Sequence, residues 1–77
     1  MNIKVSNLSP VTSREELLDC FAVYGAVSDV SVGTYMLEGK SRALGFVVMH
    51  SNVQGQAAID GLQGIELDGN LLVVNKE

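Results

Sequence analysis

The chain has 77 residues, of which 47% are hydrophobic and 18% are charged, a composition typical of one small folded domain with a single core. No apolar run approaches the ~18 residues that a membrane span requires, and a lone cysteine excludes an internal disulfide bond. Five Lys and Arg stand against nine Asp and Glu, and this net charge of -4 argues against tight binding to nucleic acid, which depends on cations at the phosphates.

The first part of the chain predicts a strand followed by a helix. Ile3, Val5 and Leu8 indicate a short alternating strand, and the turn and cap residues of NLSPVTS follow it. Ser13 and Glu16 fit a capping box at the start of the helix. One face of that helix carries apolar residues at helical spacing, namely Leu17, Cys20, Phe21 and Tyr24, and Gly25 is expected to end it. Cys20 is therefore interpreted as a core residue rather than a redox or metal group.

The rest of the chain predicts two strands, a second helix and a last strand. AVSDVSV and ALGFVVMH indicate neighbouring antiparallel strands, with EGK in the loop between them. Ser51 can cap a helix in which Val53, Ala58 and Leu62 lie on one face, although Gly55 and Gly61 each weaken it by about 1 kcal/mol relative to Ala. ELDGNLLVVN then offers a turn and a final strand.

This βαββαβ order predicts an α+β fold, a ferredoxin-like sandwich in which a four-stranded antiparallel sheet carries two helices on one face. The other face of the sheet is then open to water. Alternation along the strands directs seven side chains to this open face: Lys4, Ser6, Ser31, Leu44, Phe46, Val48 and Val73. The four apolar members form one contiguous patch, and such a patch on an uncovered sheet more often marks a binding surface than scattered exposure.

Four stretches of the sequence match the motifs of one known family, in the same order and at the same spacing. IKVSNL matches its first-strand hexapeptide, SREELLDCFAVYGAV its first helix and turn, RALGFVVM its third-strand octapeptide, and AAIDGLQGIELDGNLLVVN its second helix and last strand. Over nearly its whole length the chain resembles the RNA recognition motif. The resemblance implies that residues 1–77 form a single domain of this family, of the single-domain bacterial type.

Both family motifs are degenerate in this chain. Aromatic rings stack on bases at three positions of the family, and these positions are Lys4, Leu44 and Phe46 here, so one ring of three remains. The resemblance implies weak binding of single-stranded RNA, with single-stranded DNA as an alternative ligand. Cationic residues are expected at phosphates and asparagines at base edges. The residues assigned to this contact are Lys4, Ser6, Asn7, Lys40, Arg42, Leu44, Phe46, Val48, Val73 and Asn75.

A second hypothesis comes from the segment TYMLEGKSR, which is usually a charged loop in similar proteins. Here it holds three large apolar residues in a row, and a mobile loop has no structural need of them. They either fold back onto the sheet or contact a partner. The alternative function is therefore binding to a protein partner, or to a second copy, through Tyr35, Met36, Leu37, Leu44 and Phe46.

Enzymatic and cofactor chemistry has little support in the sequence. His50 is the only histidine, and neither a nucleophile with a base nor a spaced set of metal ligands accompanies it. We expect no catalytic residue, no metal and no cofactor. MNIKV does not have the form of a secretion leader, so the cytoplasm is the expected location, with no membrane partner.

Overall fold

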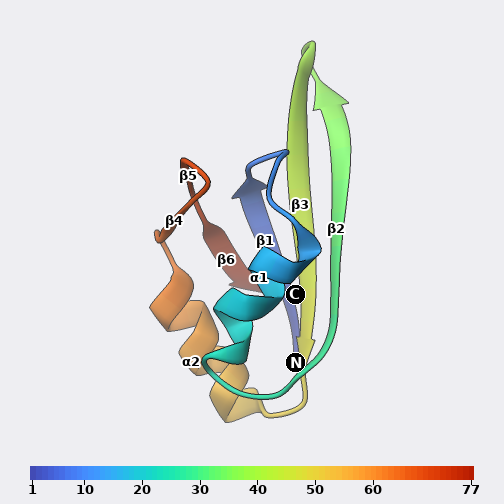
Figure 1. Ribbon diagram of the computed structural model, residues 1–77. Coiled ribbons are helices and arrows are strands. Elements are labelled where there is room, and N and C mark those ends of the chain that lie inside the picture. The colour runs from blue at the N-terminus through green and yellow to red at the C-terminus, as the bar shows by residue number, and fades with distance from the viewer.

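The computed structural model describes residues 1–77 and confirms a four-stranded antiparallel sheet with two helices on one face (Figure 1). The sheet has the order β2-β3-β1-β6, formed by β1 (Asn2–Leu8), β2 (Val27–Leu37), β3 (Lys40–Met49) and β6 (Val73–Lys76). The helices are α1 (Arg14–Ala22) and α2 (Asn52–Leu62). A small hairpin of β4 (Glu66–Leu67) and β5 (Asn70–Leu71) precedes β6. Neither helix has the length and apolar character needed to cross a membrane.

Both helices begin at the predicted caps. The Ser13 hydroxyl accepts a hydrogen bond from the Glu16 amide at 3.1 Å, and the Glu16 carboxylate accepts one from the Ser13 amide at 3.2 Å, which completes the capping box. Ser51 accepts a hydrogen bond from the Gln54 amide at 3.1 Å. These bonds satisfy amides that have no partner inside the helix, so short polar side chains fix both helix starts.

The core lies between the helices and the covered face of the sheet. Its fourteen buried residues are Ile3, Val5, Leu8, Leu17, Phe21, Val30, Ala43, Val47, Met49, Ala58, Ile59, Leu62, Leu72 and Val74. Cys20 is half-buried and packs against this cluster, as the helical spacing predicts. Tyr24 also packs against it, but from the turn after α1, because the helix ends at Ala22 and not at Gly25. The inward residues of each strand alternate with outward ones, so the sheet has one dry and one wet face.

The predicted face of the second helix is wrong at Val53, which is 82% exposed. The buried residues of α2 are Gly55, Ala58, Ile59 and Leu62, a spacing of 3, 1 and 3 that follows the helical period. At about 100° per residue Val53 lies on the opposite side from Gly55. The absence of a side chain at Gly55 leaves room for Met1, since a Cβ there would lie 2.5 Å from the Met1 sulfur.

The predicted loop TYMLEGKSR is wrong over most of its length, because all of it except Glu38 and Gly39 is paired, whereas the stretch EGK does contain the turn between the two strands. β2 and β3 stay in register from Val30↔Val47 to Leu37↔Lys40, and only Glu38 and Gly39 form the turn. Both turn residues have positive φ, 52° and 76°, as a two-residue type I′ hairpin requires. The hairpin projects beyond the rest of the sheet (Figure 1), and the molecule measures 38 × 20 × 20 Å.

A β-bulge near the end of β1 explains how Leu8 becomes buried. The register with β3 shifts between Val5↔Gly45 and Leu8↔Ala43, which leaves one extra residue on β1. Asn7 has a φ of 61°, in the left-handed region that asparagine tolerates better than most residues. The bulge turns Leu8 to the covered face, whereas strict alternation from Ile3 and Val5 would direct it to the open one.

Candidate nucleic-acid interface

The open face of the sheet is the candidate site, because neither helix covers it (Figure 1). Cross-strand pairing builds one row through its centre. Ser31 of β2 lies opposite Phe46 of β3, Phe46 lies opposite Lys4 of β1, and Lys4 lies opposite Asn75 of β6. Residues directly opposite on neighbouring strands have Cβ atoms about 4.5–5.5 Å apart. A ring, a cation and an amide therefore stand side by side.

The predicted apolar patch lies on this face. Phe46 is 39% exposed and Val73 is 43% exposed, while Leu44 and Val48 are half-buried between their neighbours. Phe21, the other phenylalanine, is fully buried in the core. Phe46 therefore buries less apolar surface on folding than Phe21 does, and its exposed ring on an uncovered sheet favours a role in binding.

Charge is unevenly distributed between the two layers of the molecule. Glu15, Glu16 and Asp19 lie in α1 and Asp60 lies in α2, on the layer opposite the open face. The strands of the open face carry Lys4 and Arg42, with Asp29 beside Val48 as an acidic residue. The overall charge of -4 therefore overstates the negative charge that a ligand on the open sheet would meet.

Lys40, which the sequence assigns to phosphate contact, lies at the tip of the hairpin rather than beside Phe46. It pairs with Leu37 next to the turn, six residues along β3 from Phe46. At about 3.4 Å per residue these two positions are roughly 20 Å apart. Lys40 can thus meet only a ligand that extends well beyond the central row.

Asn7, assigned to a base edge, is partly used by the fold. Its side-chain amide nitrogen donates to the Leu71 carbonyl at 2.8 Å, and its backbone carbonyl accepts from the Asn70 side chain at 3.1 Å. One of the two N–H donors of the Asn7 side chain is therefore occupied. Its second N–H and its amide oxygen remain available to a ligand.

The three apolar residues of the hairpin do not act as one loop cluster. Tyr35 pairs with Arg42 and Leu37 with Lys40, so both share the face of Leu44 and Phe46, whereas Met36 points to the other side. The exposed fractions are 44% for Tyr35, 51% for Leu37 and 68% for Met36. The sequence analysis did not assign Tyr35 to the nucleic-acid face, although counting in steps of two from Ser31 reaches it.

The histidine and the cysteine of the chain lie apart from each other and from the open face. No three His, Cys, Asp or Glu side chains lie close enough together to hold a metal ion. His50 is exposed just after β3. Burial first, and then the negative charges of Asp19, Glu16 and Asp68, raise the pKa of the Cys20 thiol, so it stays protonated and poorly nucleophilic at neutral pH.

Comparison with known proteins gives a consistent result. The family model described as "RNA recognition motif" matches residues 3–73. RbpE of Nostoc sp. (strain PCC 7120), whose name assigns it to the RNA-binding proteins, is 41% identical over 76 residues, which are 99% of this chain and 77% of RbpE.

Two solved structures are similar in both sequence and fold. The crystal structure of RNA binding protein PG1 is 37% identical with a TM-score of 0.84, over 97% of this chain and 90% of that one. The second domain of this family in yeast poly(U)-binding protein, Pub1, is 32% identical with a TM-score of 0.80, over 96% of this chain and 89% of that one.

Proposed function

Because the chain belongs to the RNA recognition motif family, we propose that it binds single-stranded RNA on the open face of its sheet. The observation that carries the proposal is Phe46, a ring that is 39% exposed at the centre of an uncovered sheet and lies opposite Lys4. A flat aromatic face stacks on any base and contributes roughly 1–3 kcal/mol per base. With one such ring, the affinity should be weak.

The proposed contact comprises the residues that the sequence assigns to it, in graded roles. Phe46 stacks on a base, Leu44, Val48 and Val73 give apolar contact around it, and Ser6 and Asn75 offer hydrogen bonds on the same face. Lys4 holds a phosphate, and Arg42 adds a second cation on the same face toward the hairpin. Asn7 can contribute its amide oxygen and its second N–H, and Lys40 can contribute only beyond the central row.

We further propose that the chain acts as a binding domain over residues 1–77 and not as an enzyme. Single-stranded DNA is a second ligand to test, because base stacking alone does not distinguish the two sugars. The cytoplasmic location stays a prediction of the sequence.

Fluorescence anisotropy with a labelled single-stranded RNA of random sequence tests the proposal. Phe46→Ala should weaken binding by about 5- to 150-fold, the equivalent of one stacked base at roughly 1–3 kcal/mol. The control is Ile65→Ala, since Ile65 is 46% exposed but lies between α2 and β4, outside the sheet. Equal losses in the two variants, or none in either, would refute stacking on Phe46.

One observation favours a second candidate function, which is pairing between two copies of the chain along the free edge of β2. The other edge of the sheet is closed, because the Gln63 side chain accepts from the Val74 amide at 3.0 Å and donates to the Val74 carbonyl at 2.7 Å. On β2 a similar closure exists at Val30 alone, where Asp29 accepts from the amide and Arg14 donates to the carbonyl.

Beyond Val30 the edge of β2 is unprotected. Backbone groups of successive strand residues alternate between the two sides, so Val32, Thr34 and Met36 direct theirs outward as Val30 does. The segment Val30–Leu37 carries neither a charge nor a proline, the devices that usually prevent edge pairing. A second copy could therefore extend the sheet by antiparallel pairing.

Sedimentation over a range of protein concentrations, without RNA, tests this pairing. Thr34→Lys places a charge at the edge and should abolish any concentration-dependent dimer, whereas the control Thr34→Val should keep it. A wild-type chain that stays monomeric at the highest concentration would exclude this second function.

A further inference from the structure

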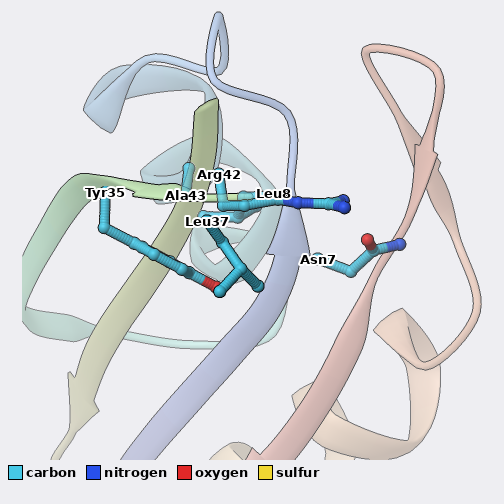
Figure 2. A pocket seen from close by; sticks show the side chains of 6 residues that line it. All are labelled: Asn7, Leu8, Tyr35, Leu37, Arg42 and Ala43. Carbon is cyan, nitrogen blue, oxygen red and sulfur yellow. The ribbon is translucent and has the colours of Figure 1, made fainter. Parts of the chain in front are cut away.

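A hollow lies on the open face where the projecting hairpin leaves the sheet (Figure 2). It has a volume of about 170 Å³ and is lined by Asn7, Leu8, Tyr35, Leu37, Arg42 and Ala43. Sites for drug-sized ligands span roughly 300–1,000 Å³, so this hollow is sized for a single ring system. It lies beyond Leu44, toward the hairpin, and is separate from the row that contains Phe46.

The apolar part of the hollow suits a flat heterocycle. Leu8 and Ala43 also line the hollow, but their side chains belong to the core on the covered face, so Tyr35 and Leu37 supply most of its apolar surface. Tyr35 and Leu37 rise from β2, and Figure 2 shows their side chains directed toward the same space. Tyr35 is 44% exposed, so part of its ring is free to stack on an aromatic ligand.

The polar part of the hollow has a defined pattern of donors and acceptors. Arg42 extends across the end of β1 and offers a planar fork of N–H donors (Figure 2). The Asn7 amide is held in one orientation, because its nitrogen donates to the Leu71 carbonyl at 2.8 Å. Figure 2 shows the Asn7 oxygen on the side nearer Arg42. A ligand thus meets the forked donor of Arg42 and, next to it, the acceptor oxygen of Asn7.

We propose that this hollow is a guanine-selective subsite for one base of the RNA, a proposal that rests on the RNA-binding function above. Guanine presents the acceptors O6 and N7 to a forked arginine, and its N1–H and amino group lie next to O6, where the Asn7 oxygen can accept. Uracil presents its N3–H between the carbonyl oxygens O2 and O4, so beside the N–H it offers Arg42 one acceptor and lacks the second that N7 provides in guanine. Adenine and cytosine present an amino donor where Arg42 requires an acceptor. The order of affinity is therefore guanine, then uracil, then adenine and cytosine.

Anisotropy titrations with four RNA octamers test this subsite. The first is all uridine, and the others carry one central guanosine, adenosine or cytidine. The guanosine octamer should bind about fivefold or more tightly than the adenosine and cytidine octamers, the lower end of what a bidentate arginine pair discriminates. Equal binding of all four would overturn the subsite and leave the RNA-binding function intact. Absence of binding to any octamer would overturn both.

Variants then identify the source of the preference. Arg42→Lys keeps the charge but loses the fork, so the ratio of guanosine to adenosine affinity should fall close to one. Phe46→Ala should lower the affinity for all four octamers in parallel and keep that ratio, because it acts outside the hollow. A ratio that survives Arg42→Lys would refute the assignment of the hollow.

Discussion

Two glycines on adjacent strands offer a sharp test of which sheet face the helices cover. An added Cβ at Gly45 would lie 2.5 Å from Leu17 Cδ2 and 3.0 Å from Leu8 Cδ1, both of which belong to the closed core. A Cβ at Gly33, on the open face opposite Leu44, would meet nothing within 4 Å. Gly45→Ala therefore forces a methyl group into the packed core, which lowers the free energy of unfolding by roughly 1–3 kcal/mol. Gly33→Ala only restricts the unfolded chain.

Restricting the unfolded chain stabilises each variant by about 0.4–1 kcal/mol, and this gain cancels when the two variants are compared. The free energy of unfolding of Gly45→Ala should therefore be roughly 1–3 kcal/mol below that of Gly33→Ala. Since each kcal/mol shifts the midpoint of a domain of this size by about 4–8 °C, thermal unfolding followed by circular dichroism resolves the difference. Equal midpoints would refute the packing of α1 against this part of β3.

Three further predictions follow from charge, backbone strain and burial. If two or three cations hold phosphates, log affinity for RNA against log salt should have a slope of about -1.5 to -2, and a slope of -4 or steeper would reveal another basic surface. Asn7→Ala should destabilise the fold by about 1–3 kcal/mol in urea titrations, because Asn7 has a φ of 61° and its side chain donates to the Leu71 carbonyl. Equal stability of Asn7→Gly and Asn7→Ala would contradict the role of that φ. The raised pKa of Cys20 should slow its alkylation at pH 8 relative to the urea-unfolded chain, and equal rates would contradict the burial of the thiol. The free energy of unfolding should also fall as pH rises above the ordinary thiol value of 9.0, because ionisation of the thiol favours the unfolded state.

Local signals predicted most of the architecture. The Ser13 and Glu16 capping box and the Ser51 cap depend on residues three apart, and the alternation of β3 is continuous from Ala43 to Met49. Such short-range patterns determine where elements begin and which face is buried. The apolar open face of β3 followed directly from this alternation.

What the sequence did not predict depends on contacts between distant parts of the chain. The bulge at Asn7 is held by bonds to Asn70 and Leu71, more than sixty residues away. The Glu38–Gly39 turn extends the hairpin because the strands on each side remain paired. Those two features create the hollow at the foot of the hairpin, so its place on the nucleic-acid face became visible only in three dimensions.

The most direct test of the proposed function is a titration of isotope-labelled protein with short single-stranded RNA of random sequence, followed by amide chemical shifts. We predict that the shifts concentrate at Lys4, Ser6, Leu44 and Phe46, because only that face of the sheet is uncovered. Shifts confined to α1 and α2, or no shifts at millimolar RNA, would contradict RNA binding on the open sheet.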